Sequence, residues 1–237
     1  ALQPGAALSS DPISQLPQAA KYRLSELGLR YGFWQSVTMV NMSDLASGSS
    51  DLEYYTATFV GKWALIEQTN SGTASWLSTE ANVQLGLSPA SRRQSPQGNL
   101  GTIVNPLATV FGPNGVWLSE LAGQQSLADG KVVVLAGLVD QSNYLDANSY
   151  ANNSQGQFLN SALVNSDVLP LPFNNLGLNL QWQPNELYYA MLGTGANNQA
   201  AGHSPFDHLS FNDWSYLLEL GVTPKDVFGL GAGKYRI

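Results

Sequence analysis

Few residues in this sequence are suited to catalysis or metal binding, and their spacing favours neither. The two histidines, His203 and His208, lie five positions apart, whereas metal-binding histidines on one helix usually lie four apart. Asp207 and Asp213 are the acidic residues beside them. We therefore expect no bound metal or cofactor.

Other catalytic and ion-binding patterns are equally weak. The chain has no cysteine, which removes thiolate catalysis, disulfides and Cys-ligated metals. It also has no Gly-x-Ser-x-Gly motif that would mark a hydrolase nucleophile. Asp140, Asp146, Asn148 and Asn152 do not follow the spacing of an EF-hand loop. The sequence does not predict an enzyme.

The composition supports binding of a ligand through neutral hydrogen-bonding groups better than it supports catalysis or metal binding. Charged residues make up 11% of the 237 residues, against roughly 25% in a typical soluble domain, and Asn, Gln, Ser, Thr and Gly take their place. The net charge of −7 disfavours nucleic acid, whose phosphates need clustered Lys and Arg. Such a composition suits a protein with one face in lipid and the other in water, although a secreted all-β domain also fits it.

The elements that would position these polar groups are β-strands. Segment 76–87 alternates: an apolar set that includes Leu77 and Val83 occupies one face, and a polar set that includes Glu80 occupies the other. Similar alternation occurs in 55–65, 176–183 and 214–223, and weaker alternation begins near Leu29, Val116, Lys131, Leu187 and Gly229. The pattern predicts nine strands. The longest apolar run, Val132–Val139, is far shorter than the ~20 residues of a membrane-spanning helix.

The connections between these strands alternate in length. Long segments alternate with short ones; the long ones are 88–115, 141–175 and 196–213, and the short ones are 68–73, 128–130, 184–186 and 224–226. Transmembrane barrels have tight periplasmic turns and longer outer loops, and they carry Trp and Tyr near strand ends, as this sequence does. A soluble β-sandwich shows the same side-chain alternation but has no reason to alternate its loop lengths.

We divide the chain into two regions. Residues 1–28 are expected to form an extended lead-in and a short helix at 19–27, and residues 29–237 a β-barrel domain. Because the chain begins at Ala1 rather than Met and carries no signal-peptide pattern, we expect a mature product whose signal peptide has been removed.

Several short motifs follow one another along the chain: Leu24–Tyr31, Gly137–Asp140, Phe158–Ala162, Leu176–Gly177, Gln183–Tyr188, Trp214–Gly221 and Gly229–Arg236. In this order they resemble the carbohydrate-selective porins (the OprB family), over most of the chain from about Leu24 onward. The resemblance implies a transmembrane antiparallel β-barrel in the outer membrane of a Gram-negative-type bacterium, in contact with lipid and lipopolysaccharide. It also implies passive diffusion of small solutes, monosaccharides above all, and often a homotrimer.

The resemblance further implies a barrel of about sixteen strands. Nine strands are about half of that number, and an odd number cannot close with every neighbouring pair antiparallel. An open sheet in hydrocarbon would leave backbone groups unpaired, at several kcal/mol each. We therefore expect this chain to be the N-terminal half of a longer porin, with the missing half of the barrel as its partner.

In a porin, function resides in the side chains that face the lumen, where amides, a few charges and aromatic rings bind sugar hydroxyls. A charge on the lipid face costs up to ~2–4 kcal/mol at mid-membrane, so the polar faces are assigned to the lumen. The pore-lining candidates are Arg30, Lys62, Glu80, Asn82, Gln84, Glu120, Asn179, Gln181, Glu219, Lys234 and Arg236. The candidates for a constriction, in the long loops, are Arg92, Arg93, Tyr144, Tyr150 and Phe158.

Two other functions remain open from the sequence. One is a soluble, secreted β-sandwich that binds carbohydrate, which predicts that Val83, Leu85 and Leu178 pack in a core. The other is a structural barrel with a plugged lumen that anchors a surface assembly. A porin instead predicts that the same apolar residues face lipid.

Overall fold

The computed structural model describes residues 20–66, 73–110, 114–147, 151–152, 157–164, 169, 171–172, 174–197, 212–229 and 231–237. Within this part of the chain, an antiparallel sheet of nine strands dominates, and each strand pairs with its neighbours in sequence. Residues 20–26 form a helix ahead of the sheet. None of the described helices has the length and apolar character needed to cross a bilayer.

The strands agree with the predicted all-β, antiparallel class. They are β1 (Leu29–Asn41), β2 (Asp51–Ile66), β3 (Ala74–Gly86), β4 (Gly115–Leu127), β5 (Val132–Val139), β6 (Asn175–Trp182), β7 (Tyr188–Ala196), β8 (Trp214–Val222) and β9 (Tyr235–Arg236). The short helices within the connections are α2 (Pro96–Leu100) and the 3-10 helices η1 (Gln141–Asn143) and η2 (Ser161–Leu163). The predicted fold is therefore confirmed at the level of elements and their order.

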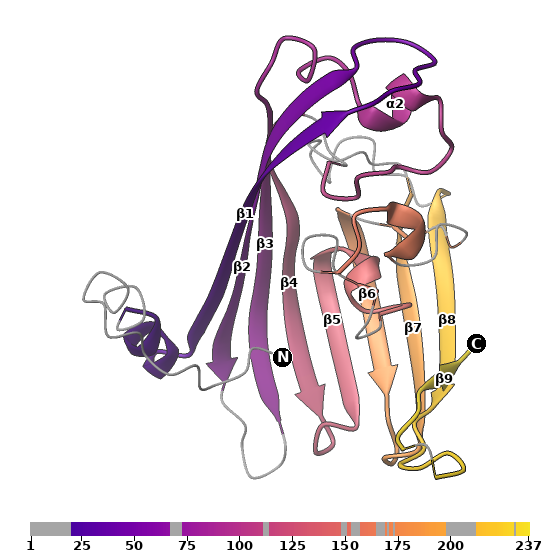
Figure 1. Ribbon diagram of the computed structural model, residues 1–237. Helices are drawn as coiled ribbons and strands as arrows, with labels where there is room; N and C mark the ends of the chain where they lie inside the picture. The colour runs from indigo at the N-terminus through magenta and orange to yellow at the C-terminus, as the bar shows by residue number, and fades with distance from the viewer. Residues whose placement is uncertain are drawn as a thin grey trace.

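The connections have the predicted asymmetry, with one correction. Short turns join β4 to β5 and β6 to β7 at one end of the sheet, and the described parts of the β3–β4 and β5–β6 connections lie toward the other end (Figure 1). The ninth strand does not begin near Gly229, as the sequence suggested; β9 starts only at Tyr235. The reason is a turn centred on Asp226, whose carboxylate accepts the backbone N–H groups of Gly229 and Gly231 at 3.0 Å each.

The apolar face of the sheet is its exposed face. Leu218 is 63% exposed, Val116 73% and Phe33 55%, whereas polar Asn82 and Glu120 on the opposite face are only 4% and 5% exposed. Leu85 and Leu178, which a sandwich would place in a core, are also exposed. The described residues therefore form a single sheet with apolar side chains outward, not two packed sheets.

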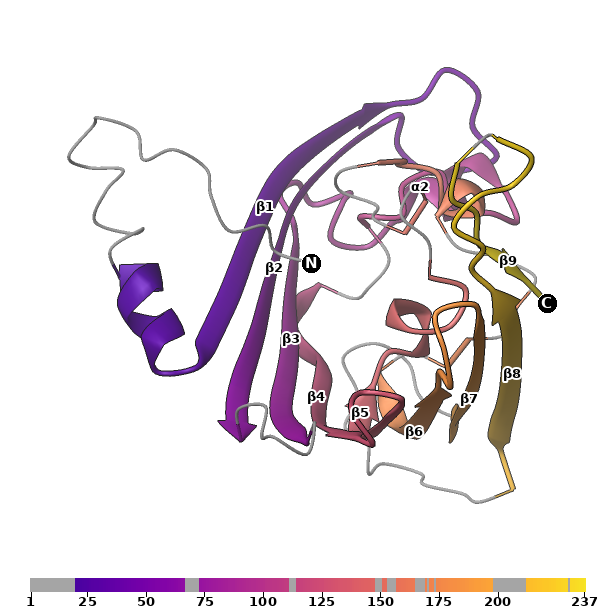
Figure 2. The ribbon, with the colours of Figure 1, turned by 90° about the horizontal axis from the view of Figure 1, so that it is seen from below.

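The polar face is the concave one. The sheet curves around the described parts of the segments that connect β3 to β4 and β5 to β6, which lie inside the curve (Figure 2). Near the long-loop end, Leu52 and Tyr54 of β2 pack against Leu107 and Val110 of the first of these connections and form a small buried cluster. The interior of the curve is thus partly filled by the protein's own loops.

A β-bulge in β4 changes which residues face inward. The β3–β4 register shifts between Glu80 and Ala81, so that Glu80 pairs with Glu120 while Ala81 pairs with Leu118. The extra residue, Ser119, lies between these pairs, and its hydroxyl donates to the Glu80 carboxylate at 2.9 Å. Ser119 and Glu120 therefore both point to the concave face, as a bulge allows.

Candidate functional site

The register of the sheet collects the predicted polar residues on the concave face. Directly opposite residues on neighbouring antiparallel strands share a face. Arg30 on β1 is opposite Lys62 on β2, and Lys62 is opposite Ser78 on β3. One step along β3 on the same face, Glu80 is opposite Glu120 on β4. Two cations and two carboxylates therefore occupy adjoining positions.

These four residues line one pocket, of about 290 Å³. Its floor is the concave face of β1 to β4, and its roof is the start of the β5–β6 connection, at Asn143 and Tyr144. The volume is about ten times the ~30 Å³ that one water molecule occupies in the liquid. The site is thus large enough for a small hydrophilic solute.

Neutral donors hold the two carboxylates of the pocket. Glu80 accepts Ser119 Oγ at 2.9 Å and Asn82 Nδ2 at 3.1 Å. Glu120 accepts the Tyr144 hydroxyl at 2.8 Å and Asn143 Nδ2 at 3.4 Å. These donors carry no charge, so the hydrogen-bond partners of both carboxylates in the pocket are neutral groups.

The cations of the pocket are likewise not paired with its carboxylates. The salt bridges among the described residues are Lys225–Glu186, Lys234–Glu219 and Arg236–Asp146, and neither Arg30 nor Lys62 takes part in one. Lys62 Nζ instead donates to Gln124 Oε1 at 3.2 Å and lies 4.7 Å from the centroid of the Trp76 ring. Its ammonium is held by a neutral amide and an aromatic face.

A tethered loop, residues 140–147, forms the roof of the pocket. At its start, the side chain of Gln141 is 1% exposed and donates to the carbonyls of Thr194 at 3.1 Å and Leu178 at 3.3 Å. Gly193 on β7 makes room for it, because a Cβ there would meet Gln141 Oε1 at 2.8 Å and the side chain of Leu145. This end of the tethered loop is fixed to β6 and β7.

The other end of the tethered loop is fixed to β8 and β9 by ionic contacts. Arg236 donates to the Asp146 carboxylate at 2.6 Å and to the Ala147 carbonyl at 2.6 Å. Glu219 accepts the backbone N–H of Asp146 at 2.8 Å and the Tyr189 hydroxyl at 2.7 Å. Together with the Tyr144–Glu120 bond, these contacts hold the tethered loop against the wall at three places.

Asp140 caps the first turn of the tethered loop. Its carboxylate accepts the backbone N–H of Ser142 at 2.9 Å and the Ser142 hydroxyl at 2.6 Å. Burial raises the pKa of Asp140 to about 7, and the charges of Glu80 and Glu120 add to the shift, while the bonds from Ser142 oppose it. The burial of Tyr144, together with its bond to Glu120, raises the pKa of that hydroxyl as well.

The remaining predicted residues are distributed more widely. By register, the amides predicted to line the pore lie on the concave face; they are Asn82, Gln84, Asn179 and Gln181. Asn179 donates to Gln141 Oε1 at 3.2 Å. Lys234 lies outside the strands, near Glu219, with its ammonium 5.1 Å from the centroid of the Tyr189 ring.

The constriction candidates do not act as one group. Of the candidates that the structure describes, Tyr144 is the one that lines the pocket formed by Arg30, Lys62, Glu80 and Glu120, which we call the charged pocket. Arg92 and Arg93 are exposed in the β3–β4 connection, where Arg92 Nε donates to the Gly86 carbonyl at 3.1 Å, and Phe158 is 43% exposed. Tyr150, like His203 and His208, lies outside the described residues.

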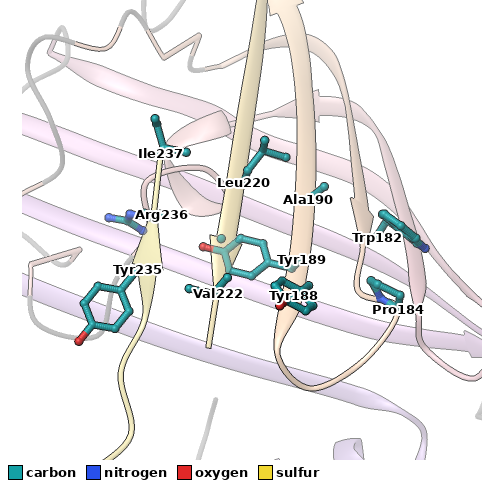
Figure 3. Close-up of a pocket in the computed structure, with 11 residues that line it drawn as sticks. Trp182, Pro184, Tyr188, Tyr189, Ala190, Leu220, Val222, Tyr235, Arg236 and Ile237 are labelled. Atoms are coloured by element: carbon teal, nitrogen blue, oxygen red, sulfur yellow. The ribbon is translucent and has the colours of Figure 1, made fainter. Parts of the chain in front are cut away.

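A larger pocket, of about 490 Å³, has a different character. It lies across β7, β8 and β9 near the short connections, and apolar and aromatic side chains line most of it, among them Trp182, Tyr188 and Leu220 (Figure 3). Aromatic rings near strand ends suit a membrane interface. We therefore assign the hydrophilic site to the charged pocket. Within the described residues, no three His, Asp or Glu side chains are grouped so as to hold a metal.

Sequence reasoning missed several contributors to the site, among them Ser119, Gln124, Gln141, Asn143 and Asp146. A signal for the bulge at Ser119 is present, because the apolar residues of β4 step from Val116 and Leu118 to Leu121, a break in the two-residue period. Nothing comparable marks Asp146, whose partner Arg236 lies 90 residues away.

No protein-family model matches the chain. An uncharacterized protein of Aquifex aeolicus (strain VF5) is 49% identical over 45 residues, which is 19% of this chain and 15% of that protein. The structure is similar to one of OprB from Pseudomonas putida, solved at high pH, with a TM-score of 0.69 and 15% identity.

The similarity to OprB covers 98% of this chain and 56% of that protein, so the chain spans about half the length of the relative. At this identity the likeness establishes the fold. The chain has the fold of part of a porin β-barrel, as the sequence predicted.

Proposed function

We propose that this chain is part of an outer-membrane channel through which small hydrophilic solutes, monosaccharides among them, pass by diffusion. The observation that carries the proposal is the reversed polarity of the sheet: apolar side chains such as Leu218 are exposed on the convex face, and polar ones such as Glu120 are buried on the concave face. Water and solutes would occupy the concave side, and lipid the convex side.

The monosaccharide assignment rests on the chemistry of the concave face and on the resemblance to carbohydrate-selective porins. Amides such as Asn82, Asn179 and Gln181 supply both donors and acceptors, which match the hydroxyl groups of a sugar. Passive diffusion needs weak, replaceable contacts rather than a nucleophile or base, so the proposal includes no catalytic step.

The setting of the channel is part of the same proposal. The convex face would contact outer-membrane lipid and lipopolysaccharide, and further strands would complete the barrel. The homotrimer common among carbohydrate-selective porins is the proposed assembly.

Conductance of the full-length protein in planar bilayers tests this function. We expect step-like channel openings in salt solution, and a current that falls as glucose is added on one side. Retention in the aqueous phase during detergent partitioning would contradict the proposal. Partition into detergent with no conductance would instead favour a plugged structural barrel, for which the loops inside the curve are the supporting feature.

A further inference from the structure

In the charged pocket, residues of like charge lie opposite one another on neighbouring strands, an arrangement that is unfavourable for a β-sheet. Arg30 is directly opposite Lys62, and Glu80 is directly opposite Glu120. Like charges directly opposite one another on neighbouring strands destabilise a sheet. Exchanging Lys62 with Glu80 would turn both pairs into ion pairs. The observed arrangement, with like charges opposite one another, is therefore the less stable of the two for the sheet.

The sorting creates a field across the pocket. Cations occupy the β1–β2 side and carboxylates the β3–β4 side, and no salt bridge joins the two sides among the described residues. Glu120 is only 5% exposed and is bonded by neutral Tyr144 and Asn143. Among the described residues, no cation forms a salt bridge with it.

We propose that this charge-sorted pocket is a binding subsite for a small zwitterion of the α-amino-acid class, an inference that rests on the proposed channel function. The ammonium group of the solute would face Glu80 and Glu120, and its carboxylate would face Arg30 and Lys62. A neutral polyol gains hydrogen bonds there but no charge interaction, and an anion is repelled by the acidic side as it is attracted by the basic one.

Three solutes of similar size separate these cases: serine, glycerol and glycerate, which are a zwitterion, a neutral polyol and an anion. Their tracer efflux is measured from vesicles that contain the full-length protein, and the efflux from protein-free vesicles is subtracted. At low salt we expect serine to leave about threefold faster than glycerol or more, because a charged, confined site raises local solute concentration. The preference should shrink at 1 M salt, where the screening length is about 3 Å.

The Lys62→Glu/Glu80→Lys double variant is the matched test, because it keeps the net charge and side-chain types while placing opposite charges across both strand pairs. We expect glycerol efflux to persist and the preference for serine to disappear. Arg30→Gln, which weakens the basic side alone, should reduce the preference in part. Lys131→Gln, in the β4–β5 turn away from the pocket, is the control that should leave it unchanged.

The outcomes distinguish the two proposals. If none of glycerol, serine and glycerate leaves faster than from protein-free vesicles, the channel function is wrong. If all three cross but serine has no advantage over glycerol, or the double variant keeps that advantage, the channel stands and the zwitterion subsite is wrong. Faster efflux of glycerate than of serine would make the pocket an anion site and would also overturn the inference.

Discussion

The hydroxyl of Tyr144 donates to the carboxylate of Glu120 at 2.8 Å and so joins the tethered loop to strand β4. The bond has two effects. It supplies a nearly buried carboxylate with a donor, and it fixes an aromatic ring at the edge of the charged pocket. The width of the pocket therefore depends on a contact that a single substitution removes.

Tyr144→Phe should loosen the tethered loop. The ring keeps its packing, but Glu120 loses its shortest hydrogen bond, which for a buried charged acceptor is worth about 1–3 kcal/mol. We expect the unfolding midpoint to fall and the open-channel current noise to rise in planar bilayers. Tyr188→Phe is the control, since Tyr188 is 52% exposed on the convex face. Unchanged noise and stability in Tyr144→Phe would show that the loop is held by its other contacts alone.

Arg236 should contribute more to stability than any exposed charge. Its guanidinium bonds the Asp146 carboxylate and two loop carbonyls, and the side chains of Arg236 and Asp146 are 22% and 17% exposed. Arg236→Gln should lower the free energy of unfolding by about 2–3 kcal/mol, because it leaves a largely buried carboxylate without its cation.

The exposed Lys225–Glu186 pair provides the matched control for Arg236. Its side chains are 83% and 78% exposed, so Lys225→Gln should leave chemical unfolding in vesicles unchanged. Arg236→Lys should recover only part of the loss, since an ammonium cannot reproduce the fork of a guanidinium. Equal effects of Arg236→Gln and Lys225→Gln would mean that the tethered loop is not anchored at Asp146.

The raised pKa of Asp140 predicts a pH dependence of stability. Its ordinary value is 3.8 and burial raises it to about 7, so the folded protein holds this proton more tightly than the unfolded chain. Stability from this group is therefore greatest below about pH 4 and is lost as pH rises to about 7. Asp140→Asn keeps an oxygen that accepts the Ser142 N–H but cannot ionise.

Thermal unfolding of Asp140→Asn and the wild type, measured from pH 4 to pH 8, checks this dependence. The two should match near pH 4, and the variant should become the more stable of the two as pH rises. A variant that is less stable than the wild type at pH 8 would show instead that the ionised carboxylate is the better cap for η1.

The faces of the strands were predictable from sequence, because the period of two places Leu77 and Val83 opposite Glu80 and Asn82 regardless of the partner strand. Register was not. Glu80 meets Glu120 at the end of the register that starts at Ala74–Ser126, and the bulge at Ser119 shifts the pairs beyond it by one residue. The start of the ninth strand was also predicted wrongly, because the turn at Asp226 was not recognised in the sequence.

Contacts between segments far apart in the chain also could not be predicted from the sequence. Tyr144 was selected as an aromatic residue in a long loop, yet its bond to Glu120 depends on how the loop lies inside the curve. Arg236 was assigned to the lumen as a charge in a strand, and its contacts with the loop at Asp146 could not be foreseen. Composition and period thus determine which side chains face inward, and tertiary packing determines which of them remain free to meet a solute.

Leu180 and Gln181 give the sharpest test of the membrane assignment, since they are adjacent on β6 and face opposite sides of the sheet. If the convex face lies in lipid, Leu180→Lys places an ammonium on the lipid side two residues from the strand end at Trp182, where the cost is smaller than the ~2–4 kcal/mol of the midplane. Gln181→Lys places the same charge on the water-filled side, where it should change stability little. Measuring the unfolding free energy of both variants in lipid vesicles compares the two faces at the same depth. Equal destabilisation by the two lysines, or a greater loss from Gln181→Lys, would mean that the apolar face does not meet lipid, and the channel would lose its main support.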